Sequence, residues 1–241
     1  MNSKEIVSNK TSVDVVEATL IFPRCVGQGE ATHLRGFFGR EFADEIMLHH
    51  HESDGRYRYE YPKVQFKVID REARLIGFNE GAELVTRIWT EVDQTKIGDE
   101  VLTIVEAKLS RWQDFIGVSD QPLTYRFRTP WLGLNQENHA KYDRMTDLIG
   151  RRELLERSLV GNCLSFAKGF KHHVQARIVA DCRELQEIQT RFKGVPMIGF
   201  IGVMRINFHI PDHAGIGKSV SRGFGTVERV HARSNPGRSS C

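Results

Sequence analysis

The sequence predicts an α+β protein built on antiparallel sheets, and three observations support that fold class. Strand and helix patterns in the first half follow the order β-α-β-β-α-β, which is the order of a ferredoxin-like unit. Helical and extended patterns return in the second half, in a less regular order. Near the C-terminal end lies a glycine-rich stretch, GIGKSVSRGFGTV at residues 215–227, which is typical of a loop.

Each element of the first half has its own pattern. β-Branched, partly alternating residues at 13–22 predict a strand, and apolar residues at helical intervals over 31–46 predict a helix. Alternation from Tyr59 to Val68 predicts a second strand, with Pro62 at a bulge or an edge. After a turn near residue 70, the remaining predictions are a strand at 74–78, a helix at 80–91 and a strand at 100–109.

The second half is harder to order. The patterns predict a strand ending at Pro130, two helices and three further strands, at 123–128, 136–145, 151–170, 174–180, 185–192 and 197–210. A second ferredoxin-like unit would need another helix between the later strands, and none is clear, so such a unit would be degenerate. Residues 234–241 are polar, with Pro236 and Gly237, and predict a flexible tail.

Composition narrows the class of protein. The chain of 241 residues has room for one large domain or two small ones, and its 40% hydrophobic and 27% charged residues are ordinary for a soluble protein. The N-terminus lacks the apolar run of a secretory signal, and no segment is long and apolar enough for a membrane span. The four cysteines are scattered without a CxxC pair, which indicates reduced thiols, no zinc site and a cytoplasmic location.

Charge is distributed unevenly along the chain. Residues 1–120 carry 15 Lys and Arg against 21 Asp and Glu, whereas residues 121–241 carry 19 against 10. A basic half fits a polyanionic partner such as nucleic acid. Charge alone fits a solvated basic surface equally well.

The glycine-rich stretch is the first candidate binding site. Glycine permits φ > 0 and close approach of a ligand, and consecutive backbone N–H groups flanked by cations can hold phosphate oxygens. The candidate nucleic-acid-binding residues combine four glycines, two hydroxyls, two cations and one aromatic ring that could stack on a base: Gly215, Gly217, Lys218, Ser219, Ser221, Arg222, Gly223, Phe224 and Gly225. A hairpin joining two strands is the competing interpretation of the same composition.

A mononucleotide P-loop does not fit this stretch. Gly217-Lys218-Ser219 resembles the end of that motif, but the glycine required five residues earlier is replaced by Asp212. Two further glycines also follow where the motif needs a long helix.

Three adjacent histidines, at 49–51, are the candidate reactive groups, because histidine transfers protons near neutral pH. The run follows the first predicted helix and precedes Gly55, which favours a helix end or turn where His49 and His51 could converge on one substrate atom. The HExxH spacing of a helical zinc site is absent. Exposed histidines without a role are the alternative.

Several segments, in order over nearly the whole chain, match the motifs of one known family. They are Leu34-Arg35-Gly36, the histidine cluster, YEYPKVQFK at 59–67, Ile76-Gly77, Glu80-Gly81 and the closing residues 211–227, with weaker support from WLGLN at 131–135 and GNCLS at 161–165. Through these segments the chain resembles the CRISPR-associated endoribonucleases that process precursor CRISPR RNA, most closely their subtype-b branch.

The resemblance implies tandem ferredoxin-like (RRM-like) domains, at 1–120 and 121–233, the first holding the histidines and the second, degenerate, holding the glycine-rich loop. It implies metal-independent cleavage within each repeat and no cofactor. The family's His-x-His pair falls on His49 and His51, and a family tyrosine falls on Tyr59. His50 stands where asparagine is common, so which two histidines act stays open.

Chemistry fits this implication, because RNA supplies its own 2′-hydroxyl nucleophile and the protein needs only an acid, a base and positioning groups. A cation such as Arg40 would stabilise charge on the phosphorane, and Lys168 and Lys171 would extend the RNA-binding surface. The expected partner is CRISPR repeat RNA, with effector-complex subunits and a second copy of the chain as open alternatives. A non-catalytic RNA-binding subunit of a CRISPR effector complex is the rival function.

Overall fold

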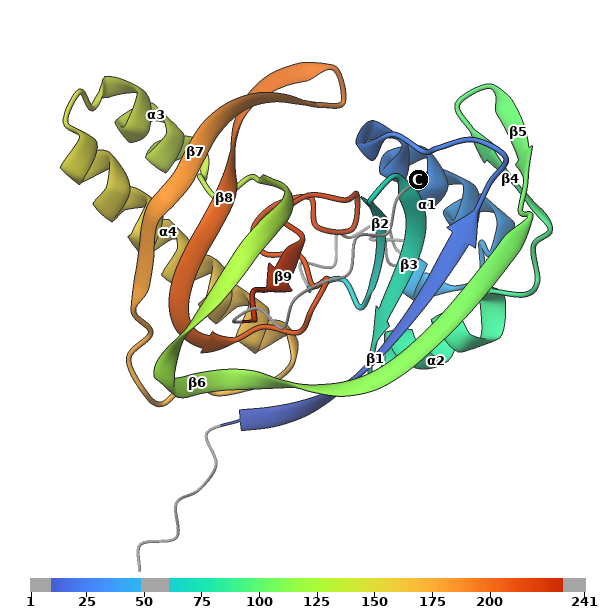
Figure 1. The fold of residues 1–241 in the computed structure, drawn as a ribbon, viewed down its shortest axis with the longest axis horizontal. Helices are drawn as coiled ribbons and strands as arrows, with labels where there is room; N and C mark the ends of the chain where they lie inside the picture. Colours follow the sequence, from blue (N-terminus) through green and yellow to red (C-terminus); the bar gives the residue numbers. More distant parts are fainter. Residues whose placement is uncertain (1–9, 49–60, 232–241) are drawn as a thin grey trace, which may run out of the picture.

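The computed structural model describes residues 10–48 and 61–231, and one seven-stranded antiparallel sheet runs through both halves of this part of the chain (Figure 1). In the first half the sheet order is β2-β3-β1-β6, the order of a ferredoxin-like unit. The elements of this half are β1 Lys10–Ile21, α1 Ala31–Glu41, β2 Val64–Ile69, β3 Glu72–Phe78, α2 Glu80–Ile88 and β6 Glu106–Trp131, with short 3₁₀ turns at Gln28–Glu30 and Ile46–Leu48. The predicted β-α-β-β-α-β order of the first half is therefore confirmed.

Both helices of this half pack on one face of the sheet. The apolar residues at helical spacing are the buried ones, including Leu34 and Phe38 of α1 and Leu84, Val85 and Ile88 of α2. All six residues of β2 are buried, so its second face must also be covered. The cover is the glycine-rich loop, described below.

The stretch predicted as one strand at 100–109 is extended, but it is divided between two strands, β5 (Glu100–Thr103) and the start of β6. β5 forms a separate two-stranded sheet with β4, Gln94–Ile97. Between β5 and β6 the chain turns a corner that two backbone hydrogen bonds fix. Ile104 N–H donates to the Asp93 carbonyl, and Val105 N–H donates to the Ile21 carbonyl. The unbroken run of β-branched and apolar residues across 101–105 gave no sign of this corner.

Strand β6 is shared by the two halves. It pairs with β1 from Glu106 to Gly117 and with β8, Val195–His209, from Gly117 onward. Its pairing with β8 is irregular between Val118 and Leu123. The boundary expected at residue 120 falls inside this irregular segment.

The second half repeats the same strand order with one helix missing. Its elements are α3 Gln136–Arg144, α4 Leu148–Gly169, β7 Ala180–Phe192, β8 and β9 Val227–Arg229. The pairings give the order β9-β6-β8-β7, again that of a ferredoxin-like unit. Residues 210–226, the glycine-rich loop and its approach, occupy the place of the second helix, so the second unit is degenerate.

Local chemistry explains where some elements differ from the predicted ranges. Helix α4 begins at Leu148, earlier than predicted, because the Asp147 carboxylate accepts from the N–H groups of Ile149 and Gly150. The predicted strand at 174–180 is wrong, since regular pairing of β7 begins only at Ala180. Residues 174–179 run irregularly, with Val179 N–H donating to the side chain of Asn207.

An aromatic cluster joins the halves. The Tyr61 ring lies 4.8 Å from that of Phe166 and 5.3 Å from that of Phe170 on the α4 side, and Phe78 of β3 packs 5.8 Å from Phe170. No helix among the described residues is long and apolar enough to cross a membrane.

Candidate nucleic-acid interface

The glycine-rich loop lies on β2, at the junction of the two halves (Figure 1). Gly215 N–H donates to the side-chain oxygen of Gln65 at 3.0 Å, and its carbonyl accepts from the Tyr61 hydroxyl at 2.8 Å. Lys67 Nζ donates to the Val220 carbonyl at 3.0 Å. The loop is therefore a structural connection between the halves.

Two of the loop glycines are required by close packing. Gly225 has φ +62°, and a Cβ there would lie 2.0 Å from the Ile216 carbonyl oxygen. Gly223 has φ +90°, and its Cβ would lie 2.9 Å from the Cβ of Ala31, the first residue of α1. A larger residue at either place would push the loop off its neighbours.

Internal hydrogen bonds already use many of the loop amides. Ile216 N–H donates to Gly225, Lys218 N–H to Leu132, and Gly225 N–H to Pro130, each to a backbone carbonyl. Gly215 N–H is held by Gln65, and Arg222 N–H by the Ser219 carbonyl. These five amides do not form the open phosphate cradle expected from the sequence.

Accessibility separates the side chains of the loop. Lys218 is exposed, and Ser219 and Arg222 are partly exposed, whereas Ser221 and Phe224 are buried. The cations are therefore the groups of the loop that can reach a polyanion. Stacking of a base directly on Phe224 is limited by its 8% exposure.

A cleft of about 420 Å³ lies between α1 and the hairpin that joins β7 to β8, whose tip leans toward the start of α1 (Figure 1). Its walls come from the 3₁₀ turn before α1, the first turn of α1, the hairpin tip and the glycine-rich loop: Gln28, Gly29, Thr32, His33, Thr190, Arg191, Phe192, Lys193, Gly194, Arg222 and Phe224.

The cleft combines cations with aromatic rings. The Phe192 and Phe224 rings meet edge to face at 5.8 Å, and the Arg222 guanidinium carbon lies 5.4 Å from the centre of the Phe192 ring. Arg191 and Lys193 are exposed on the hairpin. Sites that bind single-stranded nucleic acid usually combine cations, which bind the phosphates, with aromatic rings, which stack on the bases.

The proposed catalytic residues His49, His51 and Tyr59, and His50 with them, lie outside the described residues. The nearest described residues on either side contact the first helix and the glycine-rich loop. Leu48, which precedes His49, accepts at its carbonyl from Arg35 Nη2 at 3.5 Å, and Tyr61 donates to Gly215. Arg40 is exposed in the last turn of α1 and is not one of the residues that line the cleft.

Lys168 and Lys171 are exposed at the C-terminal end of α4 and are also not part of the cleft lining. Next to them, Lys63 Nζ donates to the Gly169 carbonyl at 2.8 Å and lies 3.6 Å from the centre of the Phe170 ring. Lys168 and Lys171 therefore border the junction between α4 and the start of β2.

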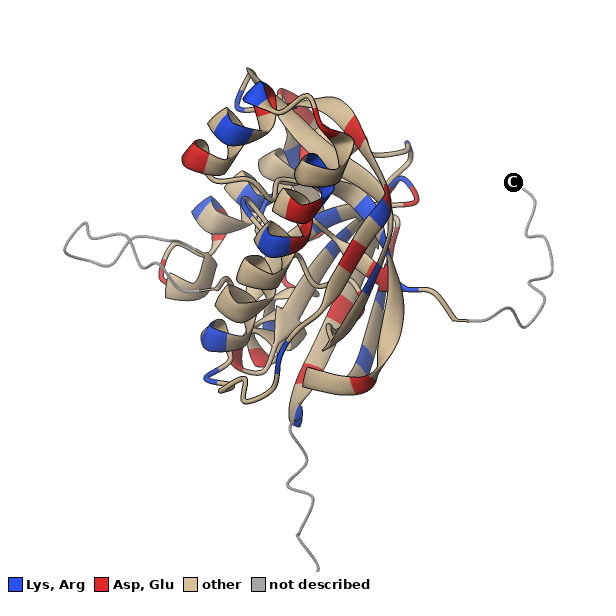
Figure 2. Cartoon of the chain, turned by 90° about the vertical axis from the view of Figure 1, so that its left-hand side faces the viewer, with Lys and Arg blue, Asp and Glu red and all other residues tan. Residues whose placement is uncertain are grey.

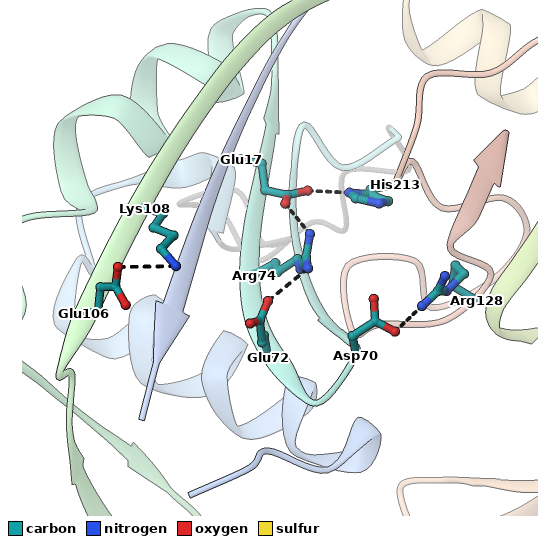
Figure 3. A network of polar contacts seen from close by, with 8 residues as sticks. All are labelled: Glu17, Asp70, Glu72, Arg74, Glu106, Lys108, Arg128 and His213. Atoms are coloured by element: carbon teal, nitrogen blue, oxygen red, sulfur yellow. Dashed lines mark hydrogen bonds and ion pairs between the residues drawn. The ribbon is translucent and has the colours of Figure 1, made fainter. Parts of the chain in front are cut away.

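Sequence reasoning missed the charged network that holds the beginning of the loop (Figure 3). Glu17 of β1 accepts from Arg74 Nη1 at 2.6 Å and lies 2.5 Å from His213 Nδ1. Burial alone would raise the pKa of Glu17, but the contacts with His213 and Arg74 hold that pKa below its ordinary value. Because Glu17 and His213 are 196 positions apart, no local pattern could pair them.

The basic hairpin and Arg35 were also missed as site residues. Arg191-Phe192-Lys193-Gly194 places an aromatic ring between two cations ahead of a glycine turn, and this signal was available in the sequence. By contrast, the face formed by α3, α4 and β7 mixes basic and acidic residues (Figure 2), with pairs such as Lys141–Glu137 and Arg152–Glu156. That face does not concentrate positive charge.

Comparisons with known proteins cover nearly the whole described chain. The model of the Cas6b N-terminal domain matches residues 11–114, and that of the Cas6b C-terminal domain matches residues 117–230. A protein of Methanocaldococcus jannaschii, called uncharacterized protein MJ0978, is 36% identical over 139 residues, which cover 58% of this chain and 94% of that protein.

Solved structures agree with these matches. One titled as a crystal structure of Cas6b is 34% identical with a TM-score of 0.84, covering 91% of this chain and 100% of that one. Another, titled as the CRISPR RNA processing endoribonuclease Cas6b, is 32% identical with a TM-score of 0.72 over the same shares. A RAMP protein described as binding different RNA substrates, 12% identical with a TM-score of 0.53 over 91% of this chain and 99% of its own, shares the fold. The chain therefore belongs to the Cas6b family.

Proposed function

We propose that this protein is a metal-independent endoribonuclease that cuts precursor CRISPR RNA within its repeats. The observation that carries the proposal is family membership, which includes a 32% identical relative described as a CRISPR RNA processing endoribonuclease. The basic and aromatic cleft between α1 and the β7–β8 hairpin supports it, because an RNA strand needs both phosphate-binding cations and stacking surfaces.

The proposed chemistry uses the substrate's own nucleophile. One of His49 and His51 accepts the proton of the 2′-hydroxyl beside the cut phosphate, and the other protonates the departing 5′-oxygen. The products are a 2′,3′-cyclic phosphate and a 5′-hydroxyl. Each positioned proton transfer contributes about 10²- to 10⁴-fold to the rate.

The two halves have separate roles in this proposal. Residues 1–120 supply the histidines and α1, and residues 121–233 supply the hairpin and the glycine-rich loop. Of the described residues on either side of the histidine segment, Leu48 contacts Arg35 of α1 and Tyr61 contacts Gly215 of the loop. This arrangement supports a reaction centre beside the strand of RNA held in the cleft.

Cleavage of repeat RNA in excess EDTA, with mapping of the product ends, tests the mechanism. We expect cleavage to persist and to leave a cyclic phosphate and a 5′-hydroxyl. A single 2′-deoxy nucleotide before the cut should abolish cleavage and leave binding nearly unchanged. Dependence on a divalent metal, or cleavage of the deoxy substrate, would contradict the proposed chemistry.

The histidines distinguish the enzyme from a non-catalytic RNA-binding subunit. We expect the His49→Ala/His51→Ala variant to bind repeat RNA like the parent and to cut it at least ~100-fold more slowly. His139→Ala is the matched control, because His139 is a partly exposed histidine on α3 that pairs only with Asp143 among the described residues. A parent protein that binds tightly and never cuts would favour the binding subunit.

A further inference from the structure

Two arginines lie on adjoining segments beside the cleft. Arg222 follows Ser221 of the loop and lines the cleft with Thr32 of α1, and Arg35 stands one helical turn after Thr32. The loop meets the start of α1 closely, since a Cβ on Gly223 would lie 2.9 Å from that of Ala31. The two guanidinium groups therefore come from segments 187 positions apart that are in contact.

Neither guanidinium meets a carboxylate within residues 10–48 and 61–231. The hydrogen-bond partner of Arg35 there is the Leu48 carbonyl, at 3.5 Å, and the side chain of Arg222 lies against the Phe192 ring. Burial, and after it the charge of Arg222, lowers the pKa of Arg35 to about 10. The pair thus carries two positive charges that the described residues do not neutralise.

Such a pair is costly unless an anion completes it. Withdrawing a charge from water and bringing a like charge near it both disfavour the charged form. A phosphate reverses both effects, because it supplies negative charge and oxygens that match the two-pronged guanidinium. The cation–π contact with Phe192 and the bond to Leu48 also limit the orientations that the two groups can take.

We propose that Arg35 and Arg222 together bind the phosphate that is cleaved and stabilise the charge that develops on its non-bridging oxygens. This inference rests on the proposed function and deepens it by naming the cations of the reaction centre. It assigns to Arg35 the role that the sequence suggested for Arg40. Arg35 is the better placed of the two because it contacts the carbonyl of Leu48, the residue before the histidines, and stands one helical turn after Thr32, which lines the cleft.

Single-turnover cleavage by Arg35→Gln and Arg222→Gln, with binding measured on the 2′-deoxy repeat, tests the pair. We expect each variant to cut ~100-fold more slowly, as for loss of one group that stabilises transition-state charge, while binding weakens less than fivefold. The double variant should lose far less than the product of the two single effects, because both groups act on one phosphate. Arg35→Lys, which keeps the charge and loses the two-pronged geometry, should fall between Arg35→Gln and the parent.

Controls separate this inference from other causes. Arg144→Gln removes an exposed arginine of α3 and should cut at the parental rate. Circular dichroism must show that each variant is folded. If Arg35→Gln does not fold, the cleavage rate of Arg35→Lys is used in its place.

Three results would overturn the proposed role of Arg35 and Arg222. The first is a cleavage rate of the glutamine variants within threefold of the parent, and the second is a loss of cleavage rate matched by an equal loss of binding. The third is a larger loss of cleavage rate for Arg40→Gln than for Arg35→Gln. In each of these cases the parent still cuts repeat RNA, so the proposed function stands. A parent that does not cut overturns both proposals.

Discussion

The ε-amino nitrogen of Lys67 lies 3.0 Å from the backbone oxygen of Val220 and donates to it across the gap between β2 and the glycine-rich loop. Both residues are buried, and burial holds the pKa of Lys67 well below its ordinary value. Lys67 is fully enclosed, so it cannot contact RNA directly in this conformation. Its amine instead fixes the loop that carries Arg222.

Replacing Lys67 by methionine should lower the unfolding free energy, because it removes the hydrogen bond to the Val220 carbonyl. The Val220 carbonyl loses its donor, so we expect the variant to lose about 1–3 kcal/mol of unfolding free energy near pH 9.5. The pKa of Lys67 is lower in the folded protein than in the unfolded one. Below the unfolded pKa, the unfolded state therefore binds more protons than the folded state. The unfolding free energy of the parent then decreases as pH falls. The gap between parent and variant should therefore narrow toward pH 7 in urea denaturation. A gap that does not change with pH would contradict a neutral buried amine.

Glu17→Gln should weaken the attachment of the loop at its other end. The variant leaves His213 and Arg74 without their shared carboxylate, and we expect a loss of about 3 kcal/mol near pH 7. Since the pKa of Glu17 is lower when folded, its contribution is present above the unfolded pKa and disappears as pH falls through the folded one. The loss should therefore shrink in acid. Glu106→Gln, at the exposed pair with Lys108, should change stability by less than about 0.5 kcal/mol.

Two glycine variants separate the cost of close packing from the cost of a positive φ. Gly225→Ala places a Cβ against the Ile216 carbonyl at φ +62°, and we expect a loss of about 3 kcal/mol or more in thermal or urea unfolding. Gly194→Ala is the matched control, because it also has positive φ, at +78°, but its Cβ meets nothing within 4 Å. It should cost only about 1 kcal/mol. Equal costs would mean that close packing does not explain the glycine at 225.

Salt dependence of RNA binding should report on the hairpin. Arg191→Gln/Lys193→Gln removes two exposed cations of the cleft, so the slope of log affinity against log salt should fall by about 0.7 for each phosphate that the variant no longer neutralises. Lys141→Gln on α3, whose amine pairs with Glu137, should leave the slope unchanged. An unchanged slope in the double variant would place the RNA elsewhere.

Much of the fold was predictable because its signals are local. The helices α1 and α2 show the spacing of one buried face, and burial follows that spacing. The strands β1 and β3 are recognisable as short runs rich in β-branched and apolar residues, and consecutive residues of both are buried. The hairpin of β4 and β5 was missed because each strand has four residues, too few for alternation to stand out. Short pairing between distant segments, as in β9 with β6, leaves no local pattern either.

The candidate site was less predictable, because glycine has two uses. A stretch with Gly215, Gly223 and Gly225 indicates that the backbone closely approaches another group, which is either a ligand or the rest of the protein. The structure shows close approach to the protein itself, at Gln65, Ala31 and Ile216. Recognising this required the position of β2, which lies some 150 residues earlier in the chain.

The loop that covers β2 is made late during translation. Until residue 220 has left the ribosome, Lys67 has no carbonyl to bond and Gln65 has no amide from Gly215. A nascent chain that ends before this point leaves polar groups of β2 open to water on the face that the finished protein buries. The N-terminal half therefore reaches its final state only when the far end of the chain folds back onto it.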